Sequence, residues 1–278
     1  QKGGFEYAAT DAAEVLRDPE IAGVLIATRH DLHARLAIEA LAAGKQVFVE
    51  KPLCLNRAEL AALRAAVERA APSGRTVWVG FNRRFAPLAV TAKALLGGGV
   101  MNIVATMNAG AIPAGHWTHD PETGGGRIVG EACHLMDLCA FLAEAPITAV
   151  CMNALGPDPQ VQTDNASILL KLANGSQAVV NYFANGSKAY AKERVEVFSQ
   201  ERTLVIDNWR RLEGFGFRGF SARRTRPDKG HAAQIEAFAR WIRNGGPSPV
   251  PFESAATSTE AALAAVESLQ RGQWVALE

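Results

Sequence analysis

The 278-residue sequence lacks the features that mark several large classes of protein. Its 29 Lys and Arg residues balance 28 Asp and Glu residues, and the formal net charge of +1 predicts binding neither to nucleic acid nor to an acidic membrane surface. It has no apolar run of the roughly 18 residues that a membrane-spanning helix needs. Small-molecule chemistry is the function class that remains.

Cysteine is also scarce, and its spacing shows no C-x-x-C pair. The four cysteines are Cys54, Cys133, Cys139 and Cys151. This spacing indicates no disulfide framework, and free thiols in a chain of this size are typical of a reducing compartment. Because the sequence opens with no basic-then-apolar leader, we predict a cytoplasmic protein.

Residues 11–80 alternate between two periodicities. Short apolar runs at 21–27, 46–50 and 76–80 read as strands, and helical spacing separates them at 32–44 and 57–71. Parallel strands need crossovers of about this length, so the pattern predicts a parallel sheet covered on both faces. We assign this α/β domain to residues 1–83.

The pattern changes after residue 83, where strands follow one another with short turns. Asn174-Gly175 is a strong hairpin signal between two of them. Predicted strands cover 103–108, 147–155, 165–172, 177–183, 194–199, 203–207 and about 212–217, and predicted helices cover 88–99, 133–144, 231–246 and 254–272. We expect an α+β domain over 84–278 with an open, mostly antiparallel sheet, whose C-terminal helices pack back on the first domain.

Parallel sheets bind ligands at the carboxyl ends of their strands. The residues at these positions are polar or basic: Thr28, Arg29 and His30, then Lys51 and Pro52, then the segment 81–84. A loop at 111–130, rich in Gly, His and Pro, follows later in the chain.

Four local patterns carry a resemblance that covers the whole chain. They are Thr28-Arg-His-Asp-Leu-His33, the segment 40–52 ending in Glu50-Lys51-Pro52, Gly80-Phe-Asn-Arg-Arg-Phe-Ala-Pro87, and the Gly-rich segment 124–137. In this order they resemble the Gfo/Idh/MocA family of NAD(P)-dependent oxidoreductases. The resemblance implies a Rossmann domain, an α+β domain whose open sheet forms a homo-oligomer interface, and hydride transfer between a nicotinamide and a carbinol carbon of a sugar, cyclitol or sugar derivative.

The resemblance also implies two catalytic residues. Lys51 would lie between nicotinamide and substrate, and His134 would act as acid or base. Removing hydride from a carbinol requires a base for the hydroxyl proton, which imidazole supplies near neutral pH, and an ammonium stabilises the developing alkoxide. The alternatives are a surface lysine after a strand and a buried histidine at a helix start.

Further site residues surround this pair. Asp137 lies three residues after His134, on the same helix face, where it could orient the imidazole or bind a substrate hydroxyl. Arg83 and Arg84 could contact the substrate or form a solvated hinge, and His33 could contact the cofactor or only hold the loop after the first strand. We therefore predict substrate binding by Asp137, Arg83, Arg84 and Trp117, and cofactor binding by Thr28, Arg29, His33, Glu50, Lys51 and Pro52.

One residue departs from the family pattern. Many members have Asp where this chain has Gly130, four residues before the histidine. Glu131 is adjacent but would point elsewhere on a regular backbone. Either the substrate contact differs, or catalysis rests on Lys51 and His134 alone.

The larger departure is at the start, because no Gly-x-Gly-x-x-Gly precedes the strand at 21–27, and this motif holds the pyrophosphate where a Rossmann domain opens. The strand at 21–27 corresponds to the fourth strand of that fold, so we expect a truncated piece of a longer protein, or another chain that covers the open edge. The Gly-rich segment resembles a subgroup in which this module follows a further domain. NAD or NADP is the expected cofactor, and its binding depends on the missing segment.

Two other function classes remain open. The chain could be a non-catalytic fragment that binds no cofactor alone and acts as an association module. A zinc site is the third reading, from His116, His119, Cys133 and His134. A long glycine-containing loop separates these two pairs and no acidic general base accompanies them, so we predict no metal.

Overall fold

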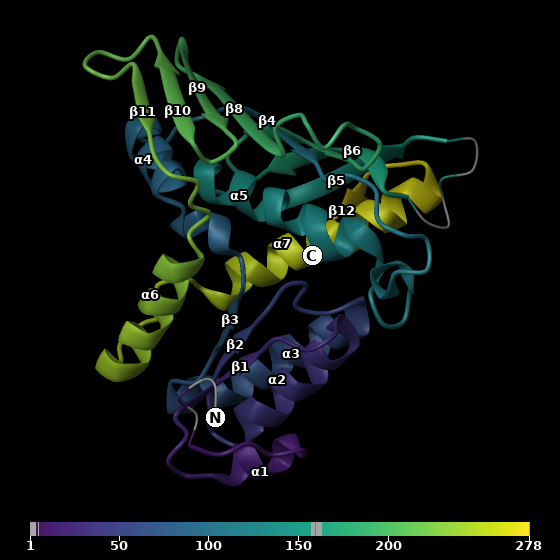
Figure 1. Ribbon diagram of the computed structural model, residues 1–278, viewed down its shortest axis with the longest axis vertical. Helices are drawn as coiled ribbons and strands as arrows, with labels where there is room; N and C mark the ends of the chain where they lie inside the picture. The colour runs from purple at the N-terminus through teal and green to yellow at the C-terminus, as the bar shows by residue number, and fades with distance from the viewer. Residues whose placement is uncertain (1–3, 5, 157–158, 160–162, 278) are drawn as a thin grey trace.

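The computed structural model describes residues 4, 6–156, 159 and 163–277 (Figure 1). Residues 1–3 and 5, at the start of the predicted first domain, lie outside the described residues. A three-stranded sheet lies beside a nine-stranded sheet, with helices packed around both. The prediction of an α/β part followed by a mostly antiparallel α+β part is confirmed.

The three-stranded sheet is parallel, with β2 in the centre. Its strands are β1 (Gly23–Ile26), β2 (Gln46–Val49) and β3 (Val77–Val79), and its helices are α1 (Ala12–Arg17), α2 (His33–Ala42) and α3 (Arg57–Ala70). The Asn56 side chain accepts a hydrogen bond from the Glu59 backbone N–H and starts α3. Within the described residues β1 pairs only with β2, so its second edge has no strand beside it.

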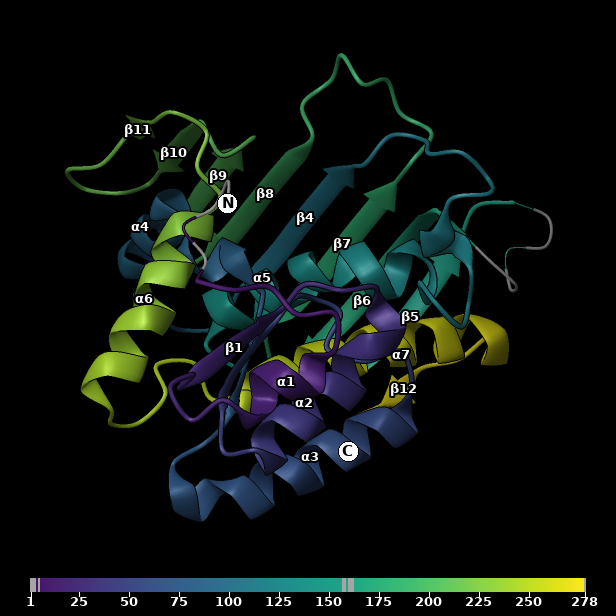
Figure 2. The ribbon, with the colours of Figure 1, turned by 60° about the horizontal axis from the view of Figure 1, so that its bottom comes forward.

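Both faces of this sheet are covered, as parallel strands require. Alternate side chains such as Val47 and Val77 belong to the main apolar core with the helices. The side chains between them, Phe48 and Trp78, point to the other face and pack against Phe238 and others of α6 (His231–Asn244). A helix from near the C-terminal end of the chain therefore covers the second face of the small sheet (Figure 2).

The nine-stranded sheet has the order β11-β10-β9-β8-β4-β7-β6-β5-β12. The pair β4 and β7 is parallel and the other neighbouring pairs are antiparallel. The strands are β4 (Asn102–Asn108), β5 (Ile147–Ala154), β6 (Asn165–Leu172), β7 (Gln177–Phe183), β8 (Glu193–Ser199), β9 (Arg202–Asp207), β10 (Arg211–Phe215), β11 (Ala222–Arg224) and β12 (Val275–Ala276). The short outer strands β11 and β12 carry no clear sequence signal.

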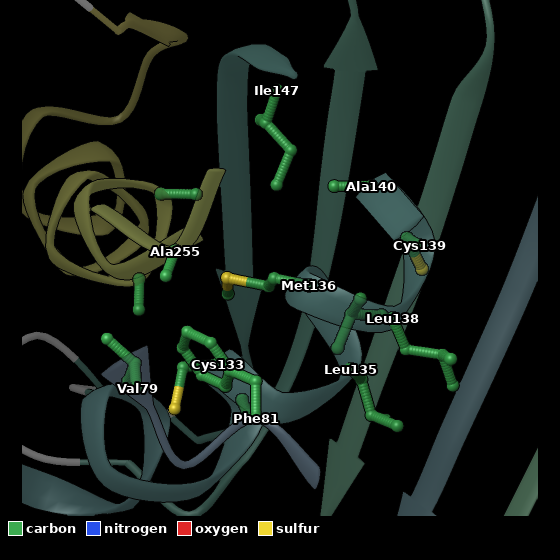
Figure 3. Close-up of a cluster of buried hydrophobic side chains, with 14 of the residues drawn as sticks. Val79, Phe81, Cys133, Leu135, Met136, Leu138, Cys139, Ala140, Ile147 and Ala255 are labelled. Carbon is green, nitrogen blue, oxygen red and sulfur yellow. The ribbon is translucent and has the colours of Figure 1, made fainter. Parts of the chain in front are cut away.

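Helices cover one face of this sheet and leave the other open. The covering helices include α4 (Pro87–Leu96), α5 (Cys133–Ala143) and α7 (Phe252–Arg271). Figure 3 shows Met136 of α5, Ala255 of α7 and Ile147 of β5 among the side chains of one buried cluster. On the open face Leu169 and Phe198 are exposed. No helix in the described part of the chain is long and apolar enough to cross a membrane.

Ion pairs join α7 to the small sheet's helix α3. The Glu260 side chain, 1% exposed, accepts hydrogen bonds from Arg57 (3.0 Å) and Arg64 (2.9 Å). Because α7 also packs against α5 and β5, this helix holds the two sheets in a fixed relation. Such a relation is needed by any site that takes residues from both.

Replacing Trp78 with alanine should destabilise the chain strongly, because its indole fills the space between β3 and α6 and donates to the Ser248 hydroxyl. We expect a loss of about 3–5 kcal/mol in the free energy of unfolding, measured by denaturant titration. Trp274→Ala, at a 39% exposed indole, is the matched control. An equal loss in both variants would contradict the packing described.

Candidate active site

A cavity of about 310 Å³ lies at the carboxyl edge of the three-stranded sheet, between the two parts of the chain. It takes residues from the loops after β1 and β2, from the segment before α4, from β4, from the loop before β8 and from the Gly-rich segment. Its lining is His30, Lys51, Arg83, Met107, Trp117, Thr118, Gly126, Arg127, Gly130, Glu131, His134 and Lys192. Both predicted catalytic residues, Lys51 and His134, line it.

Lys51 follows β2, and its position is fixed by contacts on both sides. Its ammonium donates to the Gly130 carbonyl oxygen at 3.0 Å. The carbonyl of Pro52, the next residue, accepts from His33 Nδ1 at 2.7 Å. The lysine therefore bridges the small sheet and the Gly-rich segment, and it presents an N–H-rich, positively charged group at the cavity wall.

His134 lies in the first turn of α5 and is 8% exposed. Burial lowers the pKa of His134 well below 6.5, and the nearby Arg83 and Lys51 charges lower it further. Its Nδ1 is buried and has no hydrogen-bond partner among the described residues. The ring is thus neutral at physiological pH, and a neutral imidazole can accept a proton.

Glu131 lines the same cavity, which corrects the expectation that it would point elsewhere. The predicted loop ends before residue 128, and Ile128–Ala132 form a π-helix that continues into α5. This wider turn changes the directions of its side chains. Arg127 Nε (3.0 Å) and the Tyr182 hydroxyl (2.8 Å) donate to Glu131. Burial alone would raise the pKa of Glu131, but these two hydrogen bonds and the charges of Arg127 and Lys51 together lower it.

His30 is a cavity residue that is missing from the predicted site. Its Nδ1 lies 2.7 Å from the Gly124 carbonyl oxygen, 94 residues along the chain. A side chain at Gly130 would crowd it, since a Cβ there would lie 3.0 Å from His30 Cε1. The available sequence signal was its place directly after the first strand. The absence of a side chain at Gly130 therefore leaves the space that the His30 ring occupies.

Trp117 and Arg83 form part of the cavity wall, as expected for residues near a substrate. The Trp117 indole meets His30 edge-on, with ring centroids 4.7 Å apart. Arg83 makes two 2.8 Å hydrogen bonds with Glu193, which is 1% exposed. Burial would raise the pKa of Glu193, but Arg83 and Lys229 lower it to about 2, so this pair stays ionised.

Asp137 and Arg84 do not line the cavity, which corrects their predicted substrate-binding role. Asp137 is completely buried and accepts from Arg84 Nε at 2.7 Å and from the Ser258 hydroxyl at 3.2 Å. The spacing of three residues does place Asp137 near His134 along α5, but its side chain turns into the interior. Arg84 also donates to the Ser254 hydroxyl, so this ion pair ties α5 to α7.

The residues predicted to bind cofactor lie in the loops after β1 and β2, next to the cavity, except His33, which begins α2. Thr28 and Arg29 are exposed, and Glu50 packs so closely on Gly80 that a Cβ there would lie 2.7 Å from a carboxylate oxygen. His33 is 1% exposed, and its two ring nitrogens face the Pro52 and Thr28 carbonyls, at 2.7 and 3.2 Å. His33 thereby joins the two loops, and Lys51 is the member of the set that lines the cavity.

Of the four residues considered for a zinc site, His116 and His119 form other hydrogen bonds, and Cys133 and His134 are buried. His119 bonds to Asp164 at 3.0 Å and His116 Nδ1 lies 2.9 Å from the Thr118 hydroxyl. Burial raises the pKa of Cys133 to about 12, so its thiol stays protonated. In the described ranges, no three His, Cys, Asp or Glu side chains are grouped as a metal ion requires.

Family comparison agrees with this arrangement. Residues 2–81 match the model of an oxidoreductase family with an NAD-binding Rossmann fold, and residues 91–205 match the GFO/IDH/MocA C-terminal domain. The chain belongs to the GFO/IDH/MocA family of oxidoreductases. The Rossmann assignment made from the strand-helix alternation and the motifs is confirmed.

Curated relatives extend over nearly the whole chain. A scyllo-inositol 2-dehydrogenase (NAD(+)) of Bacillus subtilis is 29% identical, over 99% of this chain and 83% of its own length. A myo-inositol 2-dehydrogenase of Thermotoga maritima is 24% identical, over 100% and 86%. Two solved structures share the fold with a TM-score of 0.84 and 24% identity: an oxidoreductase domain protein from Kribbella flavida, covering 97% of this chain and 84% of its own, and a levoglucosan dehydrogenase in complex with NADH, covering 99% and 85%.

Asp137→Asn should destabilise the chain without weakening substrate binding. The substitution leaves the buried Arg84 charge uncompensated, which costs about 3–5 kcal/mol in the free energy of unfolding. Denaturant titration measures this loss, and the paired variant Arg84→Met with Asp137→Leu should recover much of it. A raised KM at unchanged stability would instead restore Asp137 to the substrate site.

Proposed function

We propose that this chain catalyses hydride transfer between NAD and a carbinol carbon of a sugar, cyclitol or sugar derivative. The observation that carries the proposal is the joint placement of Lys51 and His134 in one cavity at the carboxyl edge of the parallel sheet. A fixed ammonium and a neutral imidazole are the two groups that oxidation of a carbinol needs. The inositol dehydrogenases among the relatives support the substrate class.

The residues present fit the nicotinamide end of a dinucleotide. Ligands of doubly wound sheets bind at the carboxyl ends of the strands, where His33 joins the loops that carry Thr28 and Pro52. Thr28, Arg29, Glu50 and Pro52 would hold the ribose and nicotinamide there. When bound, NAD supplies the hydride acceptor. The Bacillus subtilis relative named for NAD(+) favours NAD over NADP.

Lys51 would act on the oxygen of the reacting carbinol. As hydride leaves the carbon, negative charge builds on that oxygen, and an ammonium beside it stabilises the charge. The Gly130 carbonyl oxygen accepts a hydrogen bond from one of the three N–H groups of Lys51, with Nζ and the oxygen 3.0 Å apart. Two N–H groups are left for a ligand. The charge of Lys51 helps to lower the pKa of Glu131, whose oxygens accept their hydrogen bonds from Arg127 and Tyr182, so the remaining N–H groups of Lys51 would be used by the substrate.

His134 would take the hydroxyl proton. Because its pKa lies well below 6.5, the ring is neutral before reaction and has an acceptor nitrogen. The described residues bond to neither ring nitrogen, and the side chain lines the cavity. Glu131, held by Arg127 and Tyr182, would form a fixed part of the wall beside them.

The predicted homo-oligomer belongs to this proposal as well. The open face of the nine-stranded sheet, with Leu169, Phe198 and Trp274 exposed, supports pairing with a second copy of the chain. The alternative of a non-catalytic association module shares this surface. The two functions differ in cofactor binding and turnover.

Lys51→Met and His134→Asn should each lower kcat/KM by at least about 100-fold on inositols or anhydrosugars with NAD, because each removes a group needed at the reacting oxygen. Formation of NADH, followed by absorbance, measures turnover. Lys171→Met, in the nine-stranded sheet, is the matched lysine control and should keep full activity.

Retained turnover in both variants would refute the assignment. Titration of NADH fluorescence separates the remaining readings. Binding of NADH without turnover of any polyol by the unmodified chain would point to another substrate class, and failure to bind NADH would favour the association module.

In the pH profile, kcat/KM should fall on the acidic side only well below pH 6.5, where His134 becomes protonated. Protonation removes the acceptor nitrogen, so activity falls as pH drops through the pKa of His134, which burial has lowered. This acidic limb should disappear from the residual activity of His134→Asn. If kcat/KM instead falls on the acidic side at or above pH 6.5, and this fall vanishes in His134→Asn, the result would contradict a buried His134 that is neutral at physiological pH.

A further inference from the structure

The ring of His30 is held in one orientation by contacts on two sides. Its Nδ1 lies 2.7 Å from the Gly124 carbonyl oxygen, and the Trp117 indole packs edge-on against it. Because a carbonyl oxygen can only accept, Nδ1 carries the proton and donates. A neutral imidazole has a single N–H, so Nε2 of His30 is a hydrogen-bond acceptor.

The environment keeps this ring neutral. Burial lowers the pKa of His30 to about 4, with smaller contributions in the same direction from Lys51 and His33. The hydrogen bond to Gly124 acts in the opposite direction and is outweighed. The acceptor nitrogen therefore persists at every pH at which the activity would be measured.

This nitrogen has no hydrogen-bond partner among the described residues, although its ring lines the cavity. The ring rests against Gly130, where a Cβ would lie 3.0 Å from Cε1, the carbon between the two nitrogens. The Gly130 carbonyl oxygen binds the Lys51 ammonium at 3.0 Å. Lys51 and His30 therefore both lie beside Gly130, and both line the cavity.

We propose that His30 is a specificity-determining residue whose Nε2 accepts a hydrogen bond from the substrate hydroxyl adjacent to the reacting carbinol. The inference rests on the proposed function and narrows its substrates to compounds with vicinal hydroxyl groups. The reacting oxygen meets Lys51 and His134, and the neighbouring hydroxyl donates to His30. The Glu131 oxygens already accept from Arg127 and Tyr182, whereas His30 Nε2 is left for the ligand.

Two substitutions separate the anchor of His30 from its acceptor. In His30→Asn the amide nitrogen can replace Nδ1 and donate to Gly124, but the side chain ends short of Nε2. In His30→Gln the amide oxygen reaches the position of Nε2 and restores an acceptor. His116→Asn, at an exposed histidine outside the cavity lining, is the matched control.

The experiment measures kcat and KM for a ring polyol that the wild-type chain oxidises, such as an inositol, and for analogues that lack one hydroxyl each. His30→Asn should lower kcat/KM on the complete polyol about 10-fold, the equivalent of one hydrogen bond, mainly through KM. On the analogue without the adjacent hydroxyl it should have almost no effect. His30→Gln should recover part of the loss, and His116→Asn should match the wild type.

Equal losses on the polyol and on every analogue would overturn the proposal, and so would a weaker Kd for NADH at unchanged polyol KM, since the hydroxyl would then be that of the cofactor. If His30→Asn does not fold, the wild-type chain decides: it must disfavour one vicinal deoxy analogue about 10-fold, and no discrimination overturns the proposal. Absence of turnover on all polyols would overturn the proposed function with it, whereas uniform losses overturn this inference alone.

Discussion

The hydrogen bond from the Lys51 ammonium to the Gly130 carbonyl is the contact on which the site depends. It joins the loop after β2 of the small sheet to the π-helix that continues into α5, a helix that covers the nine-stranded sheet. This contact can form only if the two sheets keep a fixed position relative to each other. The ion pairs of the buried Glu260 with Arg57 and Arg64 fix that position, because they join α7 to α3.

Lys51 and Lys192 bring ammonium groups to the cavity, and the guanidinium groups beside them are paired with carboxylates. Arg83 is neutralised by Glu193, and Arg127 by Glu131 and Asp164, so the guanidinium groups at the cavity serve largely as structural supports. The imidazoles of His30 and His134 are kept neutral by burial. The cavity thus combines the ammonium groups of Lys51 and Lys192 with neutral imidazoles, and both kinds of group can hydrogen-bond to a polyhydroxylated ligand.

Much of this arrangement could be predicted from the sequence. Apolar runs separated by helical segments indicated the parallel sheet, and the position of Lys51 after β2 placed it at the ligand-binding edge. The direction of a helix face could not be predicted in the same way. The spacing of Asp137 from His134 indicated a shared face, but whether that face met the cavity or Arg84 depended on how α5 packs against α7.

Long-range and irregular features were the other limit. His30 acquires its orientation from Gly124 and Trp117, about ninety residues later, and no local pattern reports such a contact. Glu131 reaches the cavity because residues 128–132 form a π-helix, which hydrophobic periodicity does not reveal. The strands β11 and β12 are too short to carry an alternating pattern and form through pairing with β10 and β5.

The most direct test of the central claim follows the hydrogen itself. The chain is incubated with NAD and a ring polyol carrying deuterium on its carbinol carbons, and the reduced nicotinamide is examined by mass spectrometry. The account predicts one deuterium in each NADH formed by the unmodified chain. In Lys51→Met and His134→Asn it predicts that almost no labelled NADH forms. Polyol consumption without deuterium in the nicotinamide would contradict it.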